Sequence, residues 1–147
     1  MESAKFLPNR AFNPIIIICL AIGIMGCAST AADHSSIVPL PEKGNPKPFP
    51  ELLTRMKSQA SVATDCYYTN DWDNLQIAAK SMAQTASYLG KATEVPVNSQ
   101  GSISKISPEM EMESEQLLQA AKNRDEKAVN VSLQKIHSLI RRLRINN

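Results

Sequence analysis

Few side chains in this sequence have the chemistry of a catalytic or metal-binding group. The 147 residues include two histidines, His34 and His137, and three cysteines, Cys19, Cys27 and Cys66. A histidine-rich zinc site needs more imidazoles, and the sequence has neither the Cys-x-x-Cys-His motif of covalent haem nor the Glu-x-x-His motif of di-iron bundles. It also lacks Gly-x-Ser-x-Gly and a phosphate-binding glycine loop. We therefore expect that the chain is not an enzyme.

Residues 1–26 have the pattern of a signal peptide. Lys5 and Arg10 make the start basic, and residues 15–25 carry no charge and are rich in isoleucine. A basic start followed by an apolar run of ~7–15 residues is typical of a secretory signal, whereas a membrane-spanning helix needs ~20 apolar residues. An uncleaved signal anchor, and a plain signal peptide followed by an incidental cysteine, are the alternatives.

Cys27 is the residue for which the sequence indicates a covalent modification. It ends the run Ile-Met-Gly-Cys at 24–27, which resembles the bacterial lipobox. The resemblance implies cleavage before Cys27, lipid attachment to its sulfur and amine, and a place on the periplasmic side of a bacterial envelope. By analogy with enteric bacteria, Ala28 favours the outer membrane. Because Cys19 leaves with the signal, Cys66 has no partner for a disulfide, and we expect it to be a small buried residue.

Residues 27–50 are expected to form a lipidated cysteine followed by a proline-rich linker. The segment holds five of the nine prolines, with polar residues and little apolar content between them. Such a composition is typical of a semi-extended tether. His34 lies in it, and we expect no specific role for this imidazole.

From Glu51 onward, apolar residues recur with the period of an α-helix. Asp71 or Asn70 can cap a second helix and Gly90 can end it, and Ser107-Pro108 is a typical helix start. The connections are short, long and short, so neighbouring helices must be antiparallel. We therefore predict an all-α domain over 51–147, an up-down-up-down four-helix bundle with helices at 51–68, 71–89, 107–122 and 126–144.

Charged residues gather at the start of the predicted third helix and at the end of the predicted fourth helix. The glutamates at 109, 111, 113 and 115 suit a solvated helix start, and the arginines at 141, 142 and 144 suit a helix C-terminus. A cation site at the glutamates and an anion or lipid-headgroup contact at the arginines are the alternatives. The net charge of +2 gives no reason to expect nucleic-acid binding.

The predicted bundle resembles a known family. Ser-Pro-Glu-Met at 107–110 and Leu-Leu-Gln-Ala-Ala-Lys-Asn-Arg-Asp-Glu-Lys-Ala-Val at 117–129, together with the helix and loop lengths, are similar to the soluble four-helix cytochromes. These are the haem-b protein cytochrome b562 and its c-type relative, cytochrome c prime. The likeness spans about residues 51–147 and implies an antiparallel bundle with a haem between its helices.

The resemblance also assigns haem ligands, and one of them is missing. Met56 falls at the family's axial methionine, but Arg144 stands where the family has its axial histidine. A guanidinium has no lone pair suited to iron. His137, about 10 Å before Arg144 along the helix axis, is the substitute ligand that the chain offers.

We therefore expect an envelope lipoprotein whose cytochrome-like bundle lacks haem and acts as a binding or scaffold module. Its partners would be the membrane, through the lipid at Cys27, and an unidentified envelope protein. One alternative is a periplasmic electron-transfer protein that binds haem b without covalent attachment, through Met56 and His137. A second is a periplasmic metal or stress sensor.

Overall fold

The computed structural model describes residues 37–41 and 44–145, so the predicted signal peptide and the lipidation of Cys27 lie outside the described residues. Four α-helices follow one another: α1 (Phe49–Tyr68), α2 (Trp72–Leu89), α3 (Gln100–Lys122) and α4 (Glu126–Ile145), with a short 3-10 helix, η3 (Val97–Ser99), before α3. The described residues form no strand. None of the described helices has the length and apolar character needed to cross a membrane.

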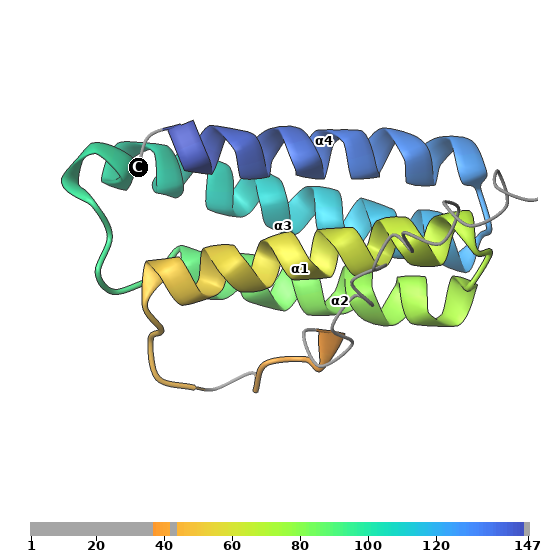
Figure 1. Cartoon of the computed structure of the whole chain (residues 1–147), viewed down its shortest axis with the longest axis horizontal. Coiled ribbons are helices and arrows are strands. Elements are labelled where there is room, and N and C mark those ends of the chain that lie inside the picture. The colour runs from red at the N-terminus through yellow and green to blue at the C-terminus, as the bar shows by residue number, and fades with distance from the viewer. Residues whose placement is uncertain (1–36, 42–43, 146–147) are drawn as a thin grey trace, which may run out of the picture. The chain divides into compact units, whose positions relative to one another are not determined.

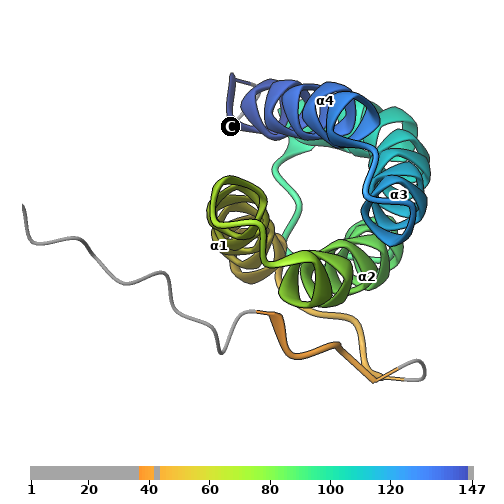
Figure 2. The ribbon, with the colours of Figure 1, turned by 90° about the vertical axis from the view of Figure 1, so that its right-hand side faces the viewer.

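The helices form an up-down-up-down bundle (Figure 1), as predicted. Seen end-on, they follow one another around a ring in sequence order (Figure 2), and helices that are consecutive in the chain pack against each other. The seam between α1 and α4, which closes the ring, has the sparsest packing of the four neighbouring pairs. Grooves at the helix seams are therefore the places where this fold can present a site.

The interior of the bundle is apolar and filled by side chains from all four helices. Each fully buried large side chain contributes about 1.5–3 kcal/mol to folding. Within this interior a hydrogen bond joins α1 to α2, from Gln59 Nε2 to Ser81 Oγ at 2.8 Å. The largest side chains with no or almost no exposure are Phe49, Leu52, Met56, Leu75, Met82, Leu89, Ile106, Met110, Leu117, Ile136 and Leu143.

The short connections are defined by side-chain caps. Asp71 Oδ1 accepts a hydrogen bond from the backbone N–H of Asn74 at 3.2 Å, which confirms Asp71 as the cap of α2. Asp125 Oδ1 accepts in the same way from the N–H of Ala128 at 3.0 Å at the start of α4. The preceding turns contain Asn70 (φ 57°) and Arg124 (φ 52°) in the left-handed region, which reverses the chain within a few residues.

The predicted start of the third helix is wrong. Helix α3 begins at Gln100, so Pro108 lies inside it. An internal proline removes one backbone hydrogen bond and costs ~3 kcal/mol. The added turns bury Ile103 and Ile106 (5% and 1% exposed), and each contributes about 1.5–3 kcal/mol. Burial of these two side chains outweighs the local start signal at Ser107-Pro108.

Ser107 joins α3 to α2 instead of capping a helix. Its Oγ donates a hydrogen bond to the backbone carbonyl of Ala86 at 2.7 Å. Helix α2 ends at Leu89, as predicted, but Gly90 has a right-handed helical backbone (φ −65°) and not a left-handed one. A Cβ on Gly90 would lie 3.0 Å from Ser107 Oγ. Gly90 therefore gives the room that this contact between α2 and α3 needs.

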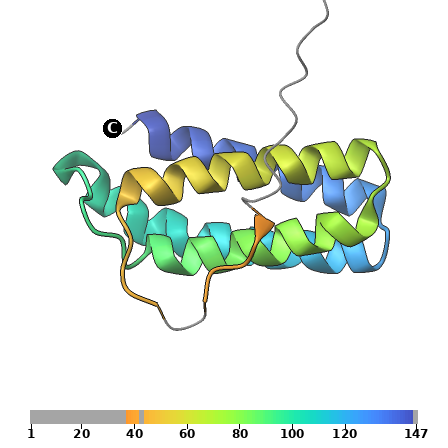
Figure 3. The ribbon, with the colours of Figure 1, turned by 60° about the horizontal axis from the view of Figure 1, so that its bottom comes forward.

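The described part of the proline-rich segment lies against the bundle and is less solvated than its composition suggests. Two of its apolar side chains are buried: Ile37 and Leu40. The Arg55 guanidinium donates to the carbonyl of Val38, and the Tyr88 hydroxyl donates to the carbonyl of Pro41. In Figure 3 this segment passes beside α2 before it enters α1. The chain is thus fixed to α1 and α2 ahead of the first helix.

Candidate functional site

Met56, which the resemblance aligns with a haem ligand, and His137, its substitute partner, do not come together. Met56 is fully buried (0% exposed), whereas His137 is exposed on α4. Nε2 of His137 lies 3.1 Å from Oγ1 of Thr64 in α1. Thr64 is about two turns from Met56, or ~12 Å along the helix axis. The two predicted ligands therefore lie at different levels of the bundle.

Haem b, the cofactor that the resemblance implies, does not fit this arrangement. The Thr64 hydroxyl donates its hydrogen to the backbone carbonyl of Ala60 at 2.8 Å, so its oxygen accepts from Nε2–H of His137. With the proton assigned to Nε2 in this way, that nitrogen is occupied by its contact with α1, and the lone pair of the ring is on Nδ1. Arg144, at the position of the family's axial histidine, is exposed and carries a permanent charge.

The glutamates of 109–115 do not form the solvated helix start that we predicted. Because α3 begins at Gln100, they lie in its middle, beyond the reach of the helix dipole. Glu113 is buried (4% exposed), and its Oε1 accepts a hydrogen bond from Lys135 Nζ at 2.8 Å. Glu109 Oε2 lies 3.2 Å from Arg142 Nη1. These two carboxylates hold α3 against α4.

The described residues do not assemble a metal site. Within 37–41 and 44–145, no group of three or more His, Cys, Asp and Glu side chains is placed to hold an ion. Glu109 and Glu113 have cationic partners on α4 instead. The geometry thus gives no support to a cation site at these glutamates.

Cys66 is buried in the core, which confirms its prediction as a small buried residue. Burial raises the pKa of its thiol, and the negative charges of Asp71 and Asp65 raise it further. A raised pKa lowers the thiolate fraction at neutral pH, and the thiolate is the reactive form. Cys66 therefore has the environment of a structural cysteine.

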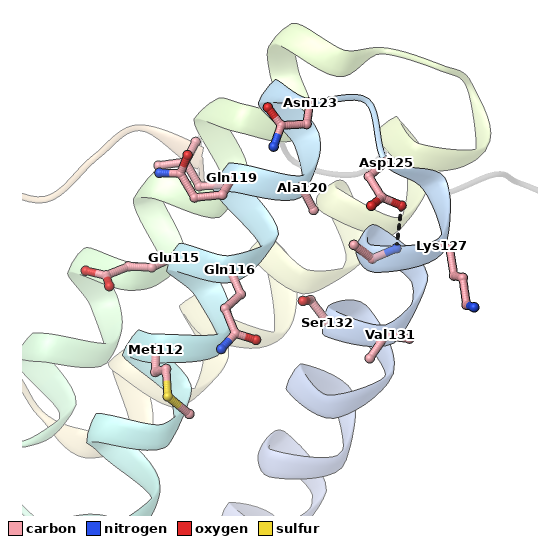
Figure 4. A pocket seen from close by; sticks show the side chains of 12 residues that line it. Met112, Glu115, Gln116, Gln119, Ala120, Asn123, Asp125, Lys127, Val131 and Ser132 are labelled. Atoms are coloured by element: carbon pink, nitrogen blue, oxygen red, sulfur yellow. Dashed lines mark hydrogen bonds between the residues drawn. The ribbon is translucent and has the colours of Figure 1, made fainter.

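An open groove of about 980 Å³ lies between α3 and α4 near the turn that joins them (Figure 4). Two large apolar side chains on it are half exposed, Met112 on α3 (48%) and Val131 on α4 (45%). Gln116 and Ser132 lie opposite one another between the two helices (Figure 4). We call this surface the α3–α4 groove; its lining is completed by Glu115, Leu118, Gln119, Ala120, Asn123, Asp125, Lys127 and Ala128.

A second groove, of about 800 Å³, lies along the seam between α1 and α4. Helix α1 contributes Lys57, and α4 contributes the other lining residues: Gln134, His137, Ile140, Arg141 and Arg144. Both helices expose the charged ends of these side chains because the apolar stripe of each points to the core. We call this surface the α1–α4 groove. It contains Arg144, which stands at the position of the family's axial histidine, and His137, the substitute haem ligand that the chain offers.

Sequence reasoning missed both grooves because each lies between two helices. One signal for the α3–α4 groove was present: Met112 and Val131 fall outside the apolar stripes of their own helices. The α1–α4 groove had a weaker signal. Only the α1–α4 packing brings Lys57 to the same seam as the arginines, which lie far from it in sequence.

Comparison of the chain with protein-family models, with curated proteins and with solved structures found no match.

Proposed function

We propose that this chain is a lipid-anchored protein on the periplasmic side of a bacterial envelope, and that its bundle binds another envelope protein through the α3–α4 groove. The signal pattern of residues 1–26 and the lipobox-like run before Cys27 support the anchor. The candidate catalytic residue types are few, which supports a binding role over an enzymatic one.

One observation carries the binding role: Met112 and Val131 stay half exposed on opposite walls of the α3–α4 groove. An amphipathic helix buries its apolar stripe against the core, so half-exposed apolar side chains outside that stripe leave apolar surface uncovered. Covering apolar surface yields about 25 cal/mol per Å², which makes such a groove a favourable place for a partner.

The shape of the groove favours a helical partner segment. Two antiparallel helices with a groove between them can accept an amphipathic helix, whose apolar face enters while its polar face meets the rim. The rim here is polar and of mixed charge, with Glu115 on α3 and Lys127 on α4. Such a rim suits a partner helix that carries both charges beside its apolar stripe.

Site-specific photo-crosslinking in the producing bacterium tests this role. A photoreactive residue in place of Met112 should give a discrete crosslinked product with an envelope protein, and the added substitution Val131→Lys should remove it, because a charge in the groove opposes burial. Ile77 on α2 is the matched control, since it is also apolar and 43% exposed but lies outside the groove. Equal products from both positions, or none from position 112, would show that the groove is not an interface.

We further propose that the likeness to the four-helix cytochromes is one of fold and not of cofactor. The burial of Met56, the Thr64 contact of His137 and the charge of Arg144 support this view. The electron carrier with haem b and the metal or stress sensor are the competing functions, and no contact among the described residues favours either of them.

A further inference from the structure

We propose that the α1–α4 groove binds a phosphoryl group carried on a larger molecule. Three cationic side chains line it, Lys57 from one wall and Arg141 and Arg144 from the other, and no carboxylate is among its lining residues. A planar guanidinium presents paired N–H donors that match two phosphate oxygens, and an ammonium adds a compact charge. The groove thus supplies the donor set that a phosphoryl dianion or phosphodiester requires.

From Lys135 onward, the cations of α4 divide into two rows with different partners. On the side that faces α3, Lys135 and Arg142 each have a glutamate partner, Glu113 at 2.8 Å and Glu109 at 3.2 Å. On the side that faces α1, the opposite helix contributes Lys57 in place of an acid. Among the residues that the structure describes, no carboxylate forms an ion pair with Lys57, Arg141 or Arg144.

This division points to a ligand because unbalanced positive charge between two helix walls attracts anions. Like charges that share a groove raise the local potential and concentrate counter-ions there. Lys135 and Arg142 show that α4 can neutralise its cations where neutralisation serves packing. Arg141 and Arg144, which face α1, have no carboxylate beside them in the groove. They lie along the seam between α1 and α4, where the helix packing is sparsest.

The size and lining of the groove favour a phosphate ester over the bare ion. Its volume of about 800 Å³ falls within the ~300–1,000 Å³ range of small-molecule sites. Ile140 adds an apolar wall and Gln134 an amide, which suit an organic group attached to the phosphate. Two sources supply this chemistry: the headgroup of an anionic phospholipid, or a soluble phosphate ester.

The phospholipid source rests on the lipid anchor of the proposed function. The chain between Cys27 and Ile37 can span at most ~36 Å when fully extended. Helix α4, of 20 residues, is ~30 Å long. An anchored Cys27 would therefore keep the bundle within about its own length of the headgroups, close enough for the α1–α4 groove to contact them.

Two probes test the site on the full chain purified in mild detergent. Inorganic phosphate, compared with chloride at equal ionic strength, should raise the melting temperature, because a ligand that binds only the native state stabilises it. Vesicles of phosphatidylcholine with added phosphatidylglycerol should bind more protein than vesicles of phosphatidylcholine alone. Because Lys5 and Arg10 also attract the signal segment to anionic lipid, the difference between the vesicles is assigned to the groove only by comparing variants of its arginines.

Arg141→Gln and Arg142→Gln form a matched pair, since these adjacent exposed arginines lose the same charge and only Arg141 lines the groove. We expect Arg141→Gln to weaken the response about tenfold and Arg142→Gln to leave it nearly unchanged. A response to phosphatidylglycerol, with or without one to phosphate, identifies a membrane headgroup, and a response to phosphate alone identifies a soluble ester; either supports the site. Equal weakening by the two variants, or no response of the parent to either probe, overturns it. The crosslinking experiment at Met112 tests the α3–α4 groove independently of this site. The phosphoryl site and the protein-binding groove can therefore be disproved separately.

Discussion

Replacing Met56 with alanine should lower the free energy of unfolding by about 2–5 kcal/mol. The Met56 side chain is fully buried among the large residues of the core, so its loss leaves a cavity that the neighbouring helices can fill only in part. The cost combines the lost burial of apolar surface with the lost packing contacts around the cavity. Urea-induced unfolding of the full chain, followed by circular dichroism, measures the change.

Met112→Ala is the control for this substitution, because it removes the same atoms from a side chain that is 48% exposed. We expect its effect on the free energy of unfolding to stay within about 0.5 kcal/mol. If both alanine variants destabilise the chain equally, Met56 does not occupy the packed core described above. A Met56→Ala variant with parental stability would lead to the same conclusion.

Replacing Pro108 with alanine should raise the free energy of unfolding by about 1–3 kcal/mol. Pro108 lies inside α3, where it has no N–H to donate to the turn before it and where alanine is the best helix former. The substitution restores one backbone hydrogen bond and changes an exposed position. If the third helix began at Ser107, as its sequence suggests, proline would suit the first turn and alanine would bring no gain.

Pro96→Ala is the control, because we expect it to lower the free energy of unfolding where Pro108→Ala raises it. Pro96 precedes η3 with an extended backbone (φ −56°, ψ 139°) that suits proline. Its replacement increases the freedom of the unfolded chain and should cost about 0.4–1 kcal/mol. Urea-induced unfolding measures the free energy of unfolding of both variants. A loss of stability in Pro108→Ala would contradict the placement of this residue inside the helix.

Local sequence signals predicted most helix ends because side chains near those ends determine them. Asp71 caps α2 through the N–H of Asn74, and both residues lie within one turn. The start of α3 was missed because its cause is tertiary: the burial of Ile103 and Ile106 against the other helices outweighs Ser107-Pro108. The residue pattern of one helix does not show how much burial against the other helices it will gain, so it cannot predict that this burial exceeds a local helix-start signal.

The candidate sites were predicted less well than the fold for the same reason. By its sequence alone, Glu113 is expected to be a surface residue. In the structure its carboxylate binds Lys135 of α4, which lies 22 residues away in sequence. Lys57 has no distinguishing sequence context, and only the α1–α4 seam brings it to Arg141 and Arg144. The family resemblance aligned Met56 with a haem ligand by its position along the helix, whereas the structure places it in the packed core.

A haem titration separates a binding module that fills its own core from a four-helix cytochrome. Haemin is added to the full chain in mild detergent and, in parallel, to the same detergent without protein, and both visible spectra are recorded. We predict that the protein adds no saturable Soret band to the spectrum of haemin in detergent, because buried Met56 and Thr64-bonded His137 lie at different levels of the bundle. A sharp Soret band that saturates at one haem per chain, and that is lost in Met56→Ala or His137→Ala, would contradict this prediction and establish a b-type cytochrome.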